Sequence, residues 1–581
     1  MIDIVKNVGF TITLLLLGAC GGGGGSGNPS IQTTESDNPS TQTTELTVVQ
    51  SVSPMSSAVS VSRSVQPMVN FNQSLIQSSV SNSSVQLLSP LGLPINADVS
   101  VNGSTLSVIP TDELPGDTNY TLRLAPTLQG LSGSSLDSGF TSSFSTEAQM
   151  WQGASRISSI MPDFELDMWE RVHTVAVDLA GNVTVVWVEL KDNQKVINAS
   201  RYTNGVWNTP IEIANLNANV ELDNFTALGD TEGNVTVLWI PRDVSRNLPF
   251  GLYSIRYNNG SWGDPVEVGD PGAQPIFGNL SAVVDAAGNV TAVWDQYDRD
   301  QPHYSVYSSR YSNGEWSAQV EIVGSPSYSF LKLGVDADGN VSLLFDAGRE
   351  GIYYSRYSND SWSSPIEIGK FPNNDKGYGN YHSSSPTFIV DRSGSVTVMW
   401  GLYFNAGGKM ALSDFLGMYF SRYSNGSWST PAQINNTAST YDKIGHTDVS
   451  LEADAAGNVT AVWSEVMTGH TTSAFYSSRY SEGSWSDPVE INSGPNDIYH
   501  YSLSLVVDSV GNVTAAWTEV LDDSRVVINS SHYSNGTWST PLEIDDPNAS
   551  GKPWLPILGV DAAGNVTAVW YQAGVNINRF Q

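Results

Sequence analysis

Short apolar runs recur along most of the chain at a spacing that predicts β-strands. The stretch NVTAVW at 289–294 has Val290, Ala292 and Trp294 on one face and Val293 on the other, as expected for a strand buried on both sides. This stretch belongs to a half-motif, D-x-x-G-N-V-T-x-x-W, whose eight copies start at Asp178, Asp230, Asp285, Asp336, Asp391, Asp454, Asp508 and Asp561. The copy at Asp336 ends in Phe345 where the Trp would be, and the copy at Asp391 has Ser395 for Asn. A second half-motif, R-Y-x-N-G-x-W-x-x-P-x-E-I, starts at Arg201, Arg256, Arg310, Arg356, Arg422, Arg479 and His532, with a last, partial copy at Arg579.

The two half-motifs alternate with a period of 51 to 63 residues, and together they predict four strands in each unit. Turns of the D-A-A-G and S-N-G types join the first strand to the second and the third to the fourth. Such turns form because Asp or Asn bonds its own backbone and Gly takes a positive φ. In the unit around Asp285 the expected strands are GNLSAVVD, NVTAVW, VYSSRY and EWSAQVEI. Four short antiparallel strands with a recurring Trp are typical of a β-propeller blade.

The eighth unit has only three of its four strands, and a candidate for the fourth lies near residue 150. The segment MWQGASRI at 150–157 carries Trp151 and Ile157 at the spacing that the fourth strand has elsewhere. We therefore expect an all-β protein in which an eight-bladed β-propeller over 148–581 is closed by this N-terminal strand. Closure removes sheet edges that an open array would leave exposed.

A smaller β domain is expected before the propeller, over residues 47–147. Alternation around Val65, Met68, Val69 and Phe71 and a hairpin across Asn102-Gly103 predict it. The region resembles the bacterial Ig-like domain of S-layer and other surface proteins, on the residues Ser53-Pro54, Leu114-Pro115-Gly116 before Tyr120, Leu131-Ser132-Gly133 and Phe144-Ser145-Thr146. The resemblance implies a β-sandwich that acts as a spacer or adhesion module.

The N-terminus carries the features of an exported, lipid-anchored protein. The apolar run VGFTITLLLL at 8–17 is too short to span a bilayer and has the length of a signal-peptide core. It ends in LGAC at 17–20, which resembles the lipoprotein box of bacteria. That resemblance implies a signal peptide over 1–19 and lipid attachment at Cys20. Gly21 in place of Asp then implies the outer membrane, on its periplasmic face or at the cell surface. Residues 20–46, rich in Gly, Ser and Thr, are expected to form a flexible tether.

Composition and charge narrow the possible partners. The formal net charge of −32 makes nucleic acid an unfavourable partner, because the surface repels phosphates. The single cysteine excludes an intrachain disulfide, and no Cys or His cluster has metal-ligand spacing. We expect no cofactor, no metal and a monomeric chain.

The residues copied in every blade are expected to serve the architecture. The repeated Trp residues are interpreted as core between blades, with sugar stacking as the alternative. The repeated Arg is expected to pair with a turn Asp or with carbonyl groups between blades, because an unpaired Arg is almost never buried. The alternative is a ring of arginines that binds anionic sugars.

A binding site is expected at the other end of the blades, where the connections vary in length. The spacing from the strand-2 aromatic residue to the strand-3 Arg runs from 9 residues after Trp570 to 22 after Trp400. A scaffold with constant turns at one end and variable loops at the other typically binds through the variable loops. The candidate ligand-binding residues are Asp295, Tyr297, Asp298, Arg299, His303, Tyr378, Tyr381, His382, Tyr499, His500, Trp554, Glu189, Glu465 and Glu519. They could equally be ordinary loop residues.

Aromatic rings beside carboxylates suit recognition of a glycan or protein, which is the function we expect. A carbohydrate-active hydrolase or lyase at the same end is the alternative, and a structural role in the envelope is a third. The S-N-G-x-W-S turn is similar to the Asp-box of sialidases, but it reads S-N-G where the box has S-x-D-x-G, and eight blades replace six. Acid pairs such as Asp295 with Asp298 or Glu189 with Glu519 could perform acid–base chemistry, although sequence spacing does not set their separation.

Overall fold

The protein is described by a computed structural model over residues 46–581, which form one compact unit. The described range has gaps at 159–172, 193, 217–219, 244–247, 250, 270–275, 299–302, 326–329, 347–350, 370–379, 384–385, 406–413, 435–442, 446–448, 468–472, 493–498 and 522–524. The expected signal peptide, Cys20 and almost all of the tether lie outside the described residues.

The N-terminal domain is a sandwich of two four-stranded sheets. One sheet has the order β1 (Val49–Ser53), β3 (Met68–Phe71), β6 (Thr105–Pro110), β5 (Ala97–Asn102), and the other β2 (Ala58–Val61), β8 (Phe140–Thr146), β7 (Asn119–Leu124), β4 (Val85–Leu88). A single 3-10 turn, η1 (Gln77–Ser79), precedes β4. Alternate residues such as Val69, Leu106 and Leu122 are buried between the sheets. The predicted hairpin across Asn102-Gly103 is confirmed, since β5 and β6 pair from Ala97 to Asn102.

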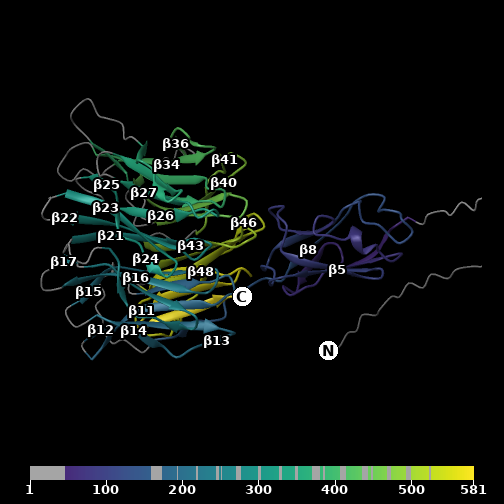
Figure 1. Cartoon of the computed structure of the whole chain (residues 1–581), viewed down its shortest axis with the longest axis horizontal. Helices are drawn as coiled ribbons and strands as arrows, with labels where there is room; N and C mark the ends of the chain where they lie inside the picture. Colours follow the sequence, from purple (N-terminus) through teal and green to yellow (C-terminus); the bar gives the residue numbers. More distant parts are fainter. Residues whose placement is uncertain are drawn as a thin grey trace, which may run out of the picture. The chain divides into compact units, whose positions relative to one another are not determined.

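Eight further sheets follow, and we call them blades 1 to 8 in chain order (Figure 1). Their first strands are β10 (His173–Val177), β15 (Val220–Gly229), β21 (Ile276–Val284), β26 (Leu331–Val335), β32 (Thr387–Val390), β38 (Val449–Ala453), β43 (Tyr499–Val507) and β48 (Trp554–Val560). Their second strands are β11 (Val183–Lys191), β16 (Val235–Asp243), β22 (Val290–Asp298), β27 (Val341–Asp346), β33 (Val396–Asn405), β39 (Val459–Met467), β44 (Val513–Val520) and β49 (Val566–Tyr571). The second strands carry the recurring Trp, which is buried as predicted, for example at Trp187 and Trp294.

The third strands carry the R-Y pair, which is His-Tyr in β45 and Arg-Phe in β50. They are β12 (Gln194–Thr203), β18 (Tyr253–Asn258), β23 (His303–Ser312), β28 (Ile352–Ser358), β34 (Asp414–Ser424), β40 (Ser473–Ser481), β45 (Val526–Ser534) and β50 (Val575–Phe580). Three short additional strands pair with second strands: β17 (Leu248–Pro249), β31 (Asn380–Ser383) and β37 (Lys443–Gly445).

The prediction of one continuous fourth strand was wrong in blades 1 to 7. Two short pieces pair with the third strand instead, and in blade 3 the break lies between Trp316 and Val320. A Pro lies at this break in most blades, and Pro cannot donate to the ladder. The pieces are β13 (Val206–Trp207) and β14 (Ile211–Asn215), β19 (Ser261–Trp262) and β20 (Val266–Glu267), β24 (Glu315–Trp316) and β25 (Val320–Ser325), β29 (Ser361–Trp362) and β30 (Ile366–Gly369), β35 (Ser427–Trp428) and β36 (Ala432–Gln433), β41 (Ser484–Trp485) and β42 (Val489–Glu490), β46 (Thr537–Trp538) and β47 (Leu542–Glu543).

Blade 8 takes its fourth strand from the segment after the sandwich domain. Strand β9 (Ser155–Arg156) pairs antiparallel with β50, and Trp151 forms a bridge to Phe580 with ring centroids 5.4 Å apart. The first strand of each blade contacts the first strand of the next, and β48 of blade 8 contacts β10 of blade 1. Figure 1 shows the C-terminal yellow strands beside β11 and β14 of the first blade.

The sandwich domain contacts the turns of blades 7 and 8. Arg63 Nη2 donates to the carbonyl of Ala563 (2.6 Å), and Asn512 Nδ2 donates to Thr118 Oγ1 (2.9 Å). Val510, in the turn of blade 7, packs into the core of the sandwich domain. The connections between the second and third strands lie at the opposite end of each blade, which we call the 2-to-3 end. Among the described residues, the 2-to-3 end makes none of these contacts with the sandwich domain.

Candidate functional site

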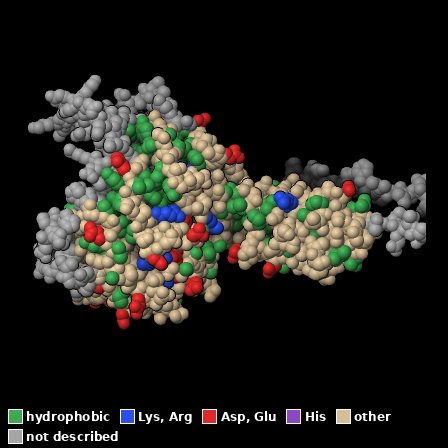
Figure 2. All heavy atoms as spheres, turned by 45° about the horizontal axis from the view of Figure 1, so that its top comes forward, with side chains coloured by type: hydrophobic (Ala, Val, Ile, Leu, Met, Phe, Trp, Pro, Cys, Tyr) green, Lys and Arg blue, Asp and Glu red, His purple; other side chains and the backbone are tan. Residues whose placement is uncertain are grey.

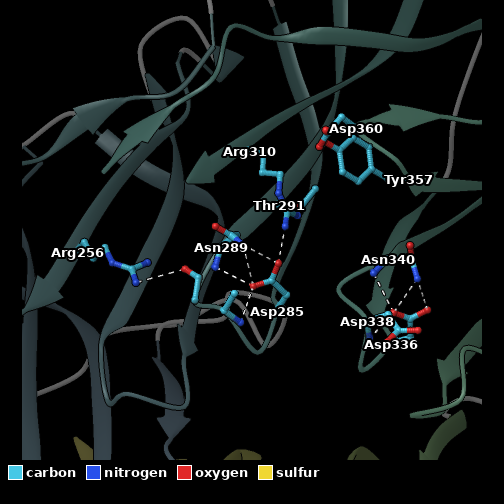
Figure 3. Close-up of polar contacts among 12 residues, drawn as sticks. Arg256, Asp285, Asn289, Thr291, Arg310, Asp336, Asp338, Asn340, Tyr357 and Asp360 are labelled. Carbon is cyan, nitrogen blue, oxygen red and sulfur yellow. Dashed lines mark hydrogen bonds and ion pairs between the residues drawn. The ribbon is translucent and has the colours of Figure 1, made fainter. Parts of the chain in front are cut away.

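The turn that recurs between the first and second strands of each blade is held by hydrogen bonds to its own aspartate. In blade 3, Asp285 Oδ1 accepts the backbone N–H groups of Ala287 (3.0 Å) and Asn289 (2.9 Å), and Figure 3 shows Asn289 turned back onto the carboxylate. The other oxygen accepts from the guanidinium of Arg310, whose Nη1 also donates to Thr291 Oγ1 (2.7 Å). One carboxylate therefore satisfies both the turn and the arginine of strand 3.

The same pair recurs around the ring. The ion pairs are Asp178–Arg201, Asp230–Arg256, Asp285–Arg310, Asp336–Arg356, Asp391–Arg422, Asp454–Arg479 and, at 3.7 Å, Asp561–Arg579. In six blades the guanidinium also lies over the Tyr of the next blade, and Arg579 of blade 8 lies 4.2 Å from the ring centroid of Tyr202 in blade 1. The prediction that the repeated Arg is architectural is confirmed, and its charge is neutralised within the fold.

The turn glycine is needed at this contact between blades. Gly233 has φ +82°, and a Cβ there would lie 2.9 Å from Asp178 Oδ2 of the preceding blade. A side chain would therefore meet both a strained backbone and a neighbouring carboxylate.

Blade 7 departs from this pattern, because His532 replaces the Arg. Its Nδ1 lies 3.0 Å from Thr514 Oγ1, while burial lowers the pKa of His532 to about 4. Asp508, the turn aspartate of this blade, has its pKa raised to about 6 by burial. At neutral pH the histidine is therefore uncharged and the aspartate ionised. Backbone N–H groups and Asn512 Nδ2 (2.8 Å) stabilise that carboxylate.

At the other end of the blades, the candidate glutamates accept hydrogen bonds from core tryptophans. Glu519 Oε2 accepts Trp517 Nε1–H (3.0 Å) and Asn529 Nδ2–H (2.7 Å). Glu465 and Glu189 accept the indole two residues before them in the same way, at 3.0 and 3.3 Å. Gln296 and Gln572 do so in blades 3 and 8. The three glutamates lie in different blades, and each has a structural partner that the sequence analysis did not assign.

Blade 3 brings several candidates together at the end of the β22–β23 hairpin. Tyr297 is the cross-strand partner of Tyr304, and their rings are 4.9 Å apart. Asp298 is paired in register with His303. Asp295 lies apart from them and is buried, where it accepts the backbone N–H of Asn279 and burial raises its pKa to about 6. Asp295 therefore supports the bulge in β21.

The remaining candidates lie in other blades. In blade 7, His500 is the register partner of Glu519, with Tyr499 beside it on β43. Trp554, half-buried, opposes Tyr571 in blade 8. Tyr381 and His382 lie on β31. Arg299 and Tyr378 lie outside the described residues.

Sequence reasoning missed several residues that the structure places at this end. Tyr304 follows His303 directly, and its alternation with Tyr297 across a hairpin was a usable signal. Asn198 and Asn529 donate to Glu189 (2.8 Å) and Glu519 and could have been found as the residues opposite the repeated Trp.

The described surface lacks the features of several other site classes. Figure 2 shows acidic side chains scattered singly, without a large basic patch on the visible face. Within the described ranges, no three His, Cys, Asp or Glu residues lie close enough to hold a metal ion. The described residues also include no helix long and apolar enough to cross a membrane. A cavity of about 210 Å³ lies in the sandwich domain between β4 and β5, lined by residues such as Leu87, Ile95 and Val99 and by no titratable side chain.

Comparisons with known proteins match the N-terminal domain to a family and assign no activity to the chain. Residues 42–146 match the bacterial Ig-like domain family, in agreement with the resemblance of this region. No curated protein sequence matches the chain.

Among solved structures, a PL25 ulvan lyase, a polysaccharide lyase, is 12% identical, with 59% of this chain and 89% of that chain covered and a TM-score of 0.40. A Hadza microbial sialidase is 11% identical, covering 63% of this chain and 75% of that one, with a TM-score of 0.33. An α-L-arabinofuranosidase from Fusarium graminearum is 11% identical over 54% of this chain and 93% of that one, with a TM-score of 0.33. Likenesses this distant assign no activity to this chain.

Proposed function

We propose that this chain is a lipid-anchored protein of the outer membrane that binds a glycan or a protein through the 2-to-3 end of its blades. The proposal rests on the contrast between residues that are copied in nearly every blade and residues that are found in one blade. The repeated Asp, Arg and Trp are engaged in holding blades together, whereas the Tyr297–Tyr304 pair belongs to blade 3. Aromatic rings that are not copied in every blade can serve a ligand rather than the architecture.

The chemistry of this hairpin end suits a sugar ring or a peptide. Two tyrosine rings offer an apolar surface with polar tips, and such surfaces stack on the faces of sugars and on apolar side chains. Asp298 and His303 are paired in register at the end of the same hairpin, and their residue types add hydrogen-bonding groups for a polar ligand.

The proposal is tested by glycan-array binding with the 46–581 chain, followed by titration of the best glycan against variants. Tyr297→Ala and Tyr304→Ala are expected to weaken binding at least about tenfold, because each removes stacking worth roughly 1–3 kcal/mol. The control Val320→Ala changes an exposed residue of the same blade and should leave affinity unchanged. Full affinity in both tyrosine variants would remove the hairpin from the site.

Glu519→Gln separates binding from the alternative of carbohydrate hydrolysis or cleavage. Gln accepts the indole N–H in blades 3 and 8, so the variant should fold and keep its thermal midpoint. A binding protein keeps its affinity and shows no turnover of the glycan over hours. Turnover by the wild-type chain that Glu519→Gln abolishes would establish the enzyme instead.

A further inference from the structure

One acidic residue at the centre of the ring occupies a position that is apolar or glycine in every other blade. The position lies two residues before the turn aspartate on the first strand, and we call it the inner position. Its occupants are Ala176, Leu228, Val283, Gly334, Ile389, Glu452, Val506 and Gly559. Glu452 therefore stands alone in its charge.

The inner position normally packs against the next blade. Leu228 packs against the core that contains Trp294 of blade 3, Ile389 against Leu451 of blade 6, and Val506 against Leu558 of blade 8. At Gly334, a Cβ would lie 2.5 Å from Val390 of the following blade. Glu452 accordingly places a carboxyl group between the first strands of blades 6 and 7, where sister blades place hydrocarbon.

Glu452 has no hydrogen bond or ion pair within the part of the chain that the structure describes, yet it is only half-buried. The titratable residues on the strands beside it are Glu465 on β39 and Tyr499, His500 and Tyr501 on β43, all toward the other end of their strands. Burial raises the pKa of Glu452 to about 8, and no nearby charge contributes to this shift. A half-buried acid without a partner breaks the pattern of the repeat at a cost in stability, which is typical of functional positions.

Hydroxyl side chains are common on the first strands two residues before the inner position, and those of Thr174, Ser281 and Ser504 accept a backbone N–H of the next blade. Four residues before the turn aspartate, the side chains are Thr174, Thr226, Ser281, Lys332, Thr387, Ser450, Ser504 and Ile557. Lys332 Nζ donates to Thr387 Oγ1 (3.3 Å), so the chain already places one primary ammonium against this row. Ser450 lies two residues from Glu452 on the same side of β38.

We infer that Glu452 anchors a binding site for a protonated primary amine at the centre of the ring. An ammonium carries one charge and three N–H donors, which one carboxylate and neighbouring hydroxyls satisfy. A divalent metal needs six or more oxygen ligands and commonly several carboxylates, which the described residues do not supply here. The amine belongs to a small molecule such as an amino sugar, or to a lysine side chain of a protein partner. This inference concerns other residues than the binding site proposed at the 2-to-3 end of the blades, and it does not depend on that site.

The test is isothermal titration calorimetry of the full chain at pH 7 with glucosamine and, separately, with N-acetyl-lysine amide. At this pH about nine tenths of the Glu452 carboxyl is protonated, so an ammonium that favours the carboxylate releases close to one proton. Titrations in phosphate and in Tris measure this release, since the two buffers take up protons with different heats. Binding of glucosamine identifies the small-molecule source, and binding of the lysine derivative alone identifies a protein source.

Glu452→Gln should weaken amine binding at least tenfold and abolish proton release, whereas Glu490→Gln, an exposed glutamate of the same blade, should change neither. Glu452→Leu, with the residue type of the sister blades, keeps the test interpretable if the glutamine variant folds poorly. The inference is overturned if neither amine binds, if binding releases no proton, or if Glu452→Gln binds equally well. It is also overturned if CaCl2, and neither amine, stabilises the wild-type chain in a manner that depends on Glu452.

Discussion

At the residue scale, the charged side chains copied from blade to blade hold neighbouring sheets together. Arg256 pairs with Asp230 of its own blade and lies over Tyr311 of the next, 4.8 Å from the ring centroid. The side chain of Asp230 is only 2% exposed, so its charge depends on this partner and on its turn. The arginine is copied because each junction between blades contains a buried aspartate that requires an ion-pair partner.

Arg256→Met is expected to lower the free energy of unfolding by about 3 kcal/mol, because it leaves the Asp230 carboxylate buried without its ion-pair partner. Chemical denaturation measures the loss. Arg525→Met is the matched control: its pair with Glu543 is exposed, 45% on the arginine side, and should contribute less than about 1 kcal/mol. Equal losses in the two variants would show that the repeated pair is dispensable.

Buried acids give the protein a pH dependence whose sign follows from their shifts. Glu452 has a folded pKa of about 8 against a usual value of 4.5, so the folded state holds a proton that the unfolded chain releases. Stability contributed by this proton is lost as the pH rises toward 8. His532, with a folded pKa of about 4, acts in the opposite direction and only below about pH 6.5.

Between pH 6.5 and 8 the free energy of unfolding should therefore fall by roughly 1.5 kcal/mol through Glu452. Denaturation curves at several pH values measure this slope, and Glu452→Gln should flatten it. A slope that survives in the variant would assign the dependence to another group.

At the element scale, the ring depends on a strand of two residues. β9 contributes few backbone hydrogen bonds to β50, but Ile157 N–H also donates to the carbonyl of Val575 (3.0 Å) and Gln152 N–H to that of Arg579 (2.9 Å). Trp151 covers Phe580 in the way that Trp207 covers Tyr202 in blade 1. The segment therefore supplies both the hydrogen bonds and the ring that the last blade lacks.

A chain that begins at residue 159 should expose the edge of β50 and self-associate, because an unpaired strand pairs with other chains. Analytical ultracentrifugation should detect oligomers, and the thermal midpoint should fall by several degrees. A chain that begins at 148 lacks the sandwich domain but keeps β9, and it should remain monomeric. Monomers of equal stability in both cases would contradict a closing role for β9.

Much of the fold was predictable from the sequence because each blade repeats its turn chemistry. The D-x-x-G-N turn and the R-Y pair locate the first three strands of a blade. The burial expected of the repeated Arg predicted a partner, either a turn Asp or carbonyl groups between blades, and the structure shows the Asp. The break in the fourth strand was missed, because the Trp and the E-I pair lie close enough in the sequence to suggest a single strand, although two separate pieces pair with the third strand. The candidate site was harder to predict, because hydrogen bonds such as that from Trp517 to Glu519 join a residue near the end of a strand to the core. Glu452 did have a signal, which appears when the first strands are aligned on their turn aspartates.

At the scale of the whole molecule, the proposed lipid anchor would hold the protein at a membrane, so that a ligand would be bound at the membrane surface. Cys20 and residues 21–45 of the tether lie outside the described residues, so the anchor remains a prediction from the sequence. Cys20→Ser should release the protein into the soluble fraction when cells are lysed and membranes sedimented, because the chain then carries no lipid. An unchanged membrane fraction would refute the anchor, and a tag inserted in the tether without loss of Cys20 serves as control.

The contact that completes the last blade also constrains how the protein is made. Gly153 N–H donates to Asn578 Oδ1 across 425 residues of chain, so two segments synthesised far apart in time must find each other. Until they meet, every partly folded form carries two unsatisfied strand edges. The rate of this last encounter, rather than the stability of any one blade, should set how much of the newly synthesised protein escapes aggregation.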